Sequence, residues 1–269
     1  MRYTQIYPDA PLQSYIRHFG VLESDAPDKQ TSTFKIIADG CPGLIFQENP
    51  DCFADKNNEK LPQLFLHGLT TSHAHKTATG RYRNLCVYFQ PHSIKTIFGI
   101  DASELTDNYV NLEAILKTDI LRQLQDEENT DKWISSISNF ISRQIELNKH
   151  RDNTKASYAV SKINANDENG LANARSALNL SERSFERMFK RNIGISPKLF
   201  FRICRFQAAL DFVRRQPPIS ASLTAIAYQH SYADQAHFIR DFKEFTGVSP
   251  RQFLQRANEQ AINFPEWQF

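Results

Sequence analysis

The stretch Phe185-x-Arg187-x-Phe189-Lys190-x-x-x-Gly194-x-Ser196-Pro197 decides the fold, because it recurs as Phe238-x-Arg240-x-Phe242-Lys243-x-x-x-Gly247-x-Ser249-Pro250. Every shared position is offset by the same 53 residues, since 238 − 185 and 250 − 197 both equal 53. A repeated unit of this length is a supersecondary motif that the chain uses twice.

Each copy predicts a helix, a stop and a second helix. The two Phe residues stand four positions apart, so they share one face of a helix, whereas the Arg between them points elsewhere. The helix is therefore expected to bury its Phe pair and to present Arg187 or Arg240. Gly194 and Gly247 are helix stops, and the Ser-Pro pair that follows caps and opens the next helix.

A further helical segment precedes each copy, over residues 170–178 and 222–230. In the first copy the connecting turn contains Asn179, which tolerates a left-handed backbone, and Ser181, which caps the next helix. In the second copy the cap is Asp234 or Ala233. Two short helices joined by a tight turn form a helix-turn-helix. One long helix over residues 197–215 is expected to join the two motifs.

Composition and charge describe an ordinary globular chain with an uneven charge distribution. The 269 residues include 32 Lys and Arg against 30 Asp and Glu, and 41% are hydrophobic, which suits one or two domains with real cores. Residues 181–256 carry 13 basic and six acidic residues, hence +7, which leaves −5 for the remainder. A basic module of this kind suits a polyanion, although a solvated basic face accounts for the charge equally well.

No apolar run reaches about 18 residues, and the first residues lack the profile of a signal peptide, so we expect a cytoplasmic protein with no membrane contact.

The region upstream of residue 148 predicts a β-rich core with appended helices. Short apolar runs at residues 34–37, 43–46, 64–66 and 85–89 are typical of strands, and apolar residues between 102 and 147 recur at helical spacing. That helical stripe either packs on the protein's own core or forms a dimer surface. We therefore predict an α+β chain: a β-rich N-terminal domain (1–150, strands to about 100, helices 102–147), an all-α domain of two helix-turn-helix motifs (156–256) and a tail (257–269).

The segment from about 156 to 256 resembles the AraC/XylS family of bacterial transcription regulators. The resemblance is carried by Ile226-Ala227-Tyr228, by Asp234 to Lys243, and by Gly247-Val248-Ser249-Pro250-Arg251-Gln252-Phe253, together with Arg205-Phe206 in the joining helix. It implies a sequence-specific DNA-binding regulator whose two recognition helices, about 181–192 and 234–246, enter successive major-groove segments of double-stranded DNA. More weakly, Ile37 to Phe46, Phe98-Gly99 and Glu104 to Asp107 resemble a sensor-like domain fused to some members of that family.

Family positions nominate the residues that contact DNA, and groove chemistry explains the choice. Arg can bridge two acceptors of guanine, and Gln can pair bidentately with adenine. The residues matched to base contacts are Arg183, Glu186, Arg187, Gln235, His237 and Arg240. The residues matched to phosphate contacts, which supply affinity and salt dependence, are Lys190, Arg191 and Lys243. A solvated helix charge is the alternative for each, and it weighs most for Glu186 and His237.

The other groups of histidine and cysteine residues give little evidence of a functional site. His67, His73 and His75 lie near Cys41, Cys52 and Cys86 in sequence, but without metal-ligand spacing, so we expect a turn with scattered histidines, no metal and no cofactor. Cys204 is expected to be a small buried apolar residue.

No catalytic motif occurs, so no catalytic residue is nominated and we expect no enzyme. The competing class is a DNA-binding protein with an N-terminal enzyme or repair module, which a cysteine cluster near the N-terminus would indicate. The first cysteine is Cys41, so the sequence favours the regulator. RNA polymerase, a small-molecule effector and a second copy of the chain are the further partners left open.

Overall fold

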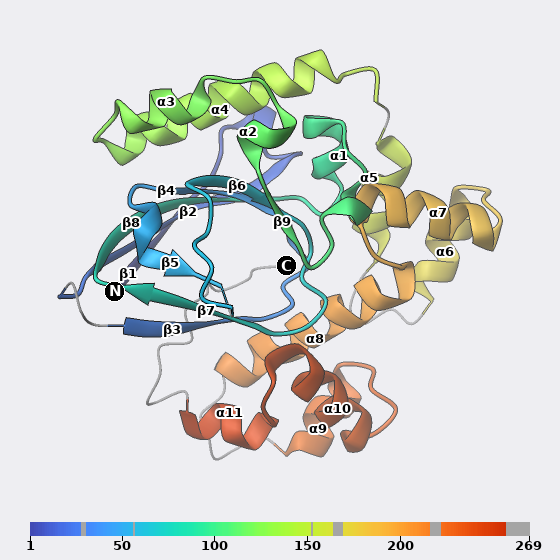
Figure 1. Ribbon diagram of the computed structural model, residues 1–269. Coiled ribbons are helices and arrows are strands. Elements are labelled where there is room, and N and C mark those ends of the chain that lie inside the picture. Colours follow the sequence, from blue (N-terminus) through green and yellow to red (C-terminus); the bar gives the residue numbers. More distant parts are fainter. Residues whose placement is uncertain (28–30, 56, 152, 164–168, 216–221, 257–269) are drawn as a thin grey trace.

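The computed structural model describes residues 1–269 except 28–30, 56, 152, 164–168, 216–221 and 257–269. Strands occupy the N-terminal part of the chain and helices the C-terminal part, with α8 running beneath the sheets toward α9, α10 and α11 (Figure 1). The predicted tail and the end of the joining segment at Pro217-Pro218 lie outside the described residues. The fold class expected from the sequence, a β-rich region followed by a helical region, is confirmed.

Two antiparallel sheets build the N-terminal region. The larger sheet has the order β1-β2-β8-β4-β6-β9 and the smaller has the order β3-β7-β5. Three alternating positions of β8 (Leu85, Val87 and Phe89) are fully buried on one face of the large sheet. The strands are β1 (Arg2–Ile6), β2 (Ile16–Asp25), β3 (Thr31–Ile36), β4 (Gly43–Gln47), β5 (Phe53–Ala54), β6 (Leu64–His67), β7 (Ala74–Thr79), β8 (Arg81–Phe89) and β9 (Tyr109–Asn111).

Four helices cover that face of the large sheet: α1 (Ser93–Phe98), α2 (Leu112–Ile115), α3 (Ile120–Gln125) and α4 (Thr130–Leu147) (Figure 1). Trp133, Ile137 and Ile141 of α4 are at most 1% exposed and belong to the same cluster as the sheet residues. Trp133 also donates from Nε1 to the carbonyl of Leu124 at 3.0 Å, which fixes α4 on α3. The apolar stripe of this region therefore packs on the protein's own core, and the dimer alternative for that stripe is not needed.

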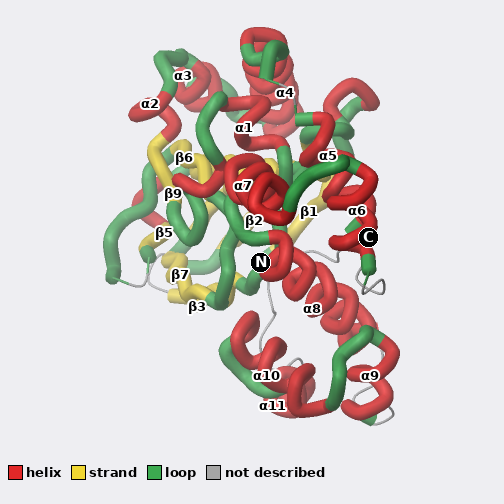
Figure 2. The backbone as a smooth tube through the Cα atoms, turned by 90° about the vertical axis from the view of Figure 1, so that its right-hand side faces the viewer, coloured by secondary structure: helices red, strands yellow, loops and turns green. Residues whose placement is uncertain are grey.

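The C-terminal helices are α5 (Thr154–Lys162), α6 (Gly170–Ala177), α7 (Glu182–Ile193), α8 (Pro197–Arg215), α9 (Leu223–Gln229), α10 (Gln235–Thr246) and α11 (Pro250–Arg256). The predicted joining helix thus has the bounds of α8, and the predicted recognition helices are α7 and α10. In the view of Figure 2, α7 lies against the N-terminal region, and α9, α10 and α11 lie below the N-terminal region at the far end of α8.

Three expectations about local structure need correction. A helix, α1, lies in the stretch expected to hold only strands, because its residues are buried on nearly all sides and show no helical periodicity. A strand, β9, lies inside the segment expected to be helical, and at three residues it is too short to give an alternating pattern. His67 and His75 do not share a turn: His67 ends β6, and His75 pairs with Lys35 on β3. Among the described helices, none is long and apolar enough to cross a membrane.

Candidate nucleic-acid interface

The first helix-turn-helix is formed by α6 and α7, and local signals set its geometry. Asn179 adopts φ +50° in the turn, and the Ser181 hydroxyl accepts from the backbone N–H of Ser184, so both expected turn roles are confirmed. Gly194 ends α7 with φ +102°. The helix buries Phe185 and Phe189, whose ring centroids lie 5.6 Å apart.

The second helix-turn-helix is formed by α9 and α10 and repeats that plan. Asp234 is the cap, and its carboxylate accepts from the backbone N–H of His237 at 2.7 Å. Ser231 takes the left-handed turn position with φ +54°, and Gly247 ends the helix with φ +72°. Phe238 and Phe242 are fully buried. The duplicated motif therefore builds two similar units on one helical core.

The residues nominated for base contact fall into two groups. Arg183, Glu186 and Arg187 on α7 and Arg240 on α10 are exposed. Gln235 and His237, in the first turn of α10, are only half-exposed because each already has a partner in the protein. The Thr224 hydroxyl donates to Gln235 Oε1 at 2.7 Å, and His237 Nε2 lies 3.1 Å from Nη2 of Arg205.

The residues nominated for phosphate contact stand nearer the C-terminal ends of both helices. Lys190 and Lys243 are exposed. Arg191 is different: its Nε donates to the carboxylate of Asp101 at 3.1 Å, and Asp101 belongs to the N-terminal region. Burial opposes ionisation of that carboxyl, but hydrogen bonds from Lys95 and Arg191 outweigh it, so the pKa of Asp101 is lowered. In this arrangement Arg191 is bound to the protein rather than free for a phosphate.

A buried ionic network ties α10 to the joining helix. Asp241 is 1% exposed and accepts from Nη2 of Arg202 at 2.8 Å and from Nη2 of Arg205 at 3.2 Å. Arg202 also donates to Glu244. Although burial opposes the charged guanidinium, its hydrogen bonds to the two carboxylates raise the pKa of Arg202. Sequence reasoning missed this network, because its members lie on two helices some 40 residues apart.

The N-terminal region touches the C-terminal ends of both recognition helices. The Thr106 hydroxyl donates to the carbonyl of Gly194 at 2.8 Å, at the end of α7. His73 Nδ1 donates to the carbonyl of Glu244 at 3.2 Å, in the last turn of α10. Between them, Gln207 of α8 donates to the carbonyl of Ala38. Together with the contact between Arg191 and Asp101, these hydrogen bonds dock the helix-turn-helix pair on the sheet region.

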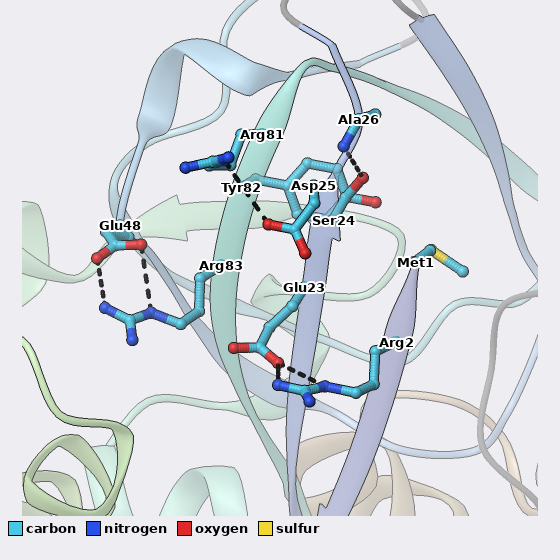
Figure 3. A pocket seen from close by; sticks show the side chains of 10 residues that line it. All are labelled: Met1, Arg2, Glu23, Ser24, Asp25, Ala26, Glu48, Arg81, Tyr82 and Arg83. Carbon is cyan, nitrogen blue, oxygen red and sulfur yellow. Dashed lines mark hydrogen bonds and ion pairs between the residues drawn. The ribbon is translucent and has the colours of Figure 1, made fainter.

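A pocket of about 740 Å³ opens beside the start of β1, the end of β2 and the start of β8 (Figure 3). Each arginine that lines it faces a carboxylate: Arg2 pairs with Glu23, Arg83 with Glu48 and Arg81 with Asp25 (Figure 3). Each arginine of the lining is therefore already paired within the protein, and we assign the pocket no ligand.

The histidines and cysteines do not converge on a metal. In the described part of the chain, no three His, Cys, Asp or Glu side chains gather closely enough to hold an ion. All four cysteines lie among the described residues and none forms a disulfide, and burial raises the pKa of the Cys41 and Cys204 thiols to about 12. Cys204 is partly buried against the helical core, close to the role expected for it.

Comparison with known proteins separates the chain into two matched regions. Residues 175–256 match the family described as "Helix-turn-helix domain", and residues 4–111 match the family described as "Domain of unknown function (DUF6597)". An "Uncharacterized HTH-type transcriptional regulator" of Haemophilus influenzae is 34% identical over 74 residues, which is 28% of this chain; the chain spans about a quarter (24%) of that relative.

Two solved structures are similar at lower identity. ToxT from Vibrio cholerae is 13% identical with a TM-score of 0.46, over 88% of this chain and 98% of ToxT. A regulator from Chromobacterium violaceum described as having an AraC-type DNA-binding domain is 23% identical with a TM-score of 0.35, over 40% of this chain and 95% of its own.

The helix-turn-helix family match covers both copies of the repeat, including the caps of α7 and α10 and their buried Phe pairs. The pair of helix-turn-helix motifs predicted from the repeat is therefore confirmed. Residues 175–256 of this chain thus match the helix-turn-helix family over both motifs.

Proposed function

We propose that the chain is a sequence-specific transcription regulator that places α7 and α10 in successive major-groove segments on one face of double-stranded DNA. The observation that carries the proposal is the duplicated position of Arg187 and Arg240. Both are exposed, and each stands between two buried Phe residues that fix its helix to the core. An arginine at such a place can bridge the two acceptors of a guanine.

The other nominated residues take roles that follow from their position. Arg183 and Glu186 share the exposed surface of α7 with Arg187, and Gln235 and His237 occupy the first turn of α10, where recognition helices contact base edges. Lys190, Arg191 and Lys243 lie toward the helix ends and are assigned to phosphates. With a rigid joining helix, the two contacts should stand about one helical turn of DNA, roughly 34 Å, apart.

The N-terminal region, in this proposal, modulates DNA binding rather than contacting DNA itself. Its contacts with Arg191 and Gly194 on α7 and with Glu244 on α10 give it direct access to both recognition helices. An effector, a second copy of the chain or RNA polymerase acting on this region would change how those helices are held. Residues 1–150 and 156–256 are accordingly proposed as separate functional domains of a cytoplasmic protein without an enzymatic activity of its own.

The test is selection of bound sites from random duplex DNA with the full chain, followed by footprinting. The proposal expects one enriched sequence and two protected patches separated by roughly 10 base pairs per monomer. The double variant Arg187→Ala, Arg240→Ala should enrich nothing. Arg143→Ala, which removes an exposed charge from α4, is the matched control and should select the wild-type site. Enrichment by the double variant equal to wild type would refute the assignment.

A further inference from the structure

The imidazole of His237 is held by groups outside its own helix. Nε2 of His237 lies 3.1 Å from Nη2 of Arg205, a residue of the joining helix α8. The Tyr232 ring stands perpendicular to the imidazole at a centroid distance of 5.2 Å. The His237 side chain nevertheless stays 34% exposed at the N-terminal end of the second recognition helix. One edge of this ring is therefore bound to the protein while part of it faces outward.

The contact with Arg205 determines where the imidazole carries its proton. A guanidinium has N–H donors and no acceptor, so Nε2 of His237 has to accept the hydrogen bond. A ring whose Nε2 accepts is neutral and carries its proton on Nδ1.

Arg205 cannot easily turn away from His237. Its Nη1 donates to the carbonyl of Ser231 at 3.1 Å, and its Nη2 also donates to Asp241 at 3.2 Å. Its guanidinium stacks on the Tyr232 ring at 4.1 Å, and the residue is only 7% exposed. The donor that faces Nε2 is therefore fixed on several sides by the turn, by the recognition helix and by an aromatic face.

We propose that Arg205 is a positioning residue that holds His237 in the Nδ1–H tautomer, so that the second recognition helix offers a hydrogen-bond donor to N7 of a purine. This inference rests on the proposed function and gives it a chemical preference at one base. In the major groove, guanine and adenine both present N7 as an acceptor, whereas cytosine presents a donor at N4. The opposite tautomer would present an acceptor at Nδ1 and would favour a donor instead, which is N4 of cytosine or N6 of adenine.

Only the second motif has the contact between Arg205 and His237 and the buried ion pair with Asp241. The positions equivalent to His237 and Asp241 in the first motif, 53 residues earlier, are Ser184 and Met188. Neither residue can form the imidazole contact or the buried ion pair. The preference should therefore appear only in the part of the site that α10 contacts.

The first experiment measures the tautomer directly in the full-length protein without DNA. Long-range ¹⁵N–¹H correlation spectra in mildly alkaline buffer should show His237 protonated on Nδ1. The variant Arg205→Leu should shift the ring toward the Nε2–H form, whereas Arg202→Leu, which removes the other guanidinium on Asp241, should not. If the wild-type ring is protonated on Nε2, or keeps Nδ1–H in a folded Arg205→Leu variant, the proposal is wrong. The wild-type spectrum decides even if Arg205→Leu fails to fold.

The second experiment locates the base. In the selected duplex, each purine of the half-site contacted by α10 is replaced in turn by its 7-deaza analogue, which lacks the N7 acceptor. One replacement should weaken wild-type binding roughly 2- to 12-fold, the worth of one hydrogen bond. That sensitivity should vanish in His237→Ala and persist in Lys243→Ala, which binds more weakly overall.

The two proposals fail in distinguishable ways. If no replacement matters, or if His237→Ala keeps the same sensitivity, the tautomer inference falls while sequence-specific binding stands. If the full chain selects no site from random DNA, the proposed function falls, and this inference falls with it.

Discussion

The ion pair between Asp101 and Arg191 predicts that the N-terminal region competes with DNA for a phosphate-binding arginine. The test is Asp101→Asn, which removes the carboxylate charge while keeping a side chain suited to cap the short 3-10 helix over Ala102–Glu104. For Arg191 to reach a phosphate it has to leave Asp101. Without the carboxylate that separation costs less, so the variant should bind its site more tightly than wild type.

The exposure of the two side chains sets the size of the gain. Asp101 is 30% exposed and Arg191 is 56% exposed, so solvent screens their attraction. Pairs of this kind contribute about 0.2 to 1 kcal/mol. At 1.4 kcal/mol per tenfold change, the dissociation constant of the Asp101→Asn protein should fall by at most about fivefold. Fluorescence anisotropy with the selected duplex, repeated at several salt concentrations, measures that difference.

Two further variants separate the ion pair from general electrostatics. Lys95 also pairs with Asp101, so Lys95→Met loses that interaction while leaving the Arg191 contact in place; it should show no gain. In an Arg191→Ala background, Asp101→Asn should no longer change affinity. An equal gain in that background would mean that Asp101 merely repels DNA through its charge, and the reasoning from the ion pair would be refuted.

Three other predictions concern the DNA contacts, the interface and the core. Arg187→Ala and Arg240→Ala should each cost about 1 to 3 kcal/mol of binding free energy on the selected site and reduce discrimination at one base position. Lys243→Ala should weaken binding to cognate and scrambled duplexes alike, and should flatten the slope of log affinity against log salt by roughly one. Titrations on both duplexes at several salt concentrations measure these differences. Burial raises the pKa of Asp39 to about 7, so the folded state holds a proton that the unfolded chain loses near pH 3.8. The free energy of unfolding should therefore decline as the pH rises between those two values. Denaturant titrations should show that decline in the wild-type protein and not in Asp39→Asn. Phe242→Ala, at a fully buried site between aromatic rings, should cost about 3 to 5 kcal/mol of unfolding free energy, and a smaller loss would show that the core relaxes.

The helix-turn-helix pair was predictable because its signals are local and duplicated. A cap at Ser181 or Asp234, a left-handed turn residue, a Phe pair at helical spacing and a glycine stop each act within a few residues. Strands such as β4 and β8 were also predictable, because each contains an apolar run in the sequence. By contrast, β7 has the sequence Ala-His-Lys-Thr-Ala-Thr, and it forms a strand because β3 and β5 pair with it on either side. No pattern within those six residues indicates that pairing.

In the candidate interface, features within a single helix were predictable from the sequence, whereas contacts between elements were not. That Arg187 and Arg240 would be exposed followed from helical spacing. That His237 would bind Arg205 did not, since the contact joins residues 32 positions apart on two helices. The contacts of Arg191 with Asp101 and of Glu244 with His73 join residues 90 and 171 positions apart. Such pairs depend on how the two regions dock, and one sequence carries no periodic signal of that.

The two copies of the motif are held in place differently. In the second copy, Asp241 fastens α10 to the joining helix through Arg202 and Arg205. The first copy has Met188 at that position, so α7 has no such buried ion pair, and its last turn instead contacts the N-terminal region through Arg191 and Gly194. The position of α10 therefore depends mainly on its own domain, whereas that of α7 depends on both regions. Any signal received by the N-terminal region should reach α7 first, so Thr106→Val, which removes the hydrogen bond to Gly194, should change binding at the half-site of α7 and leave binding at that of α10 unchanged.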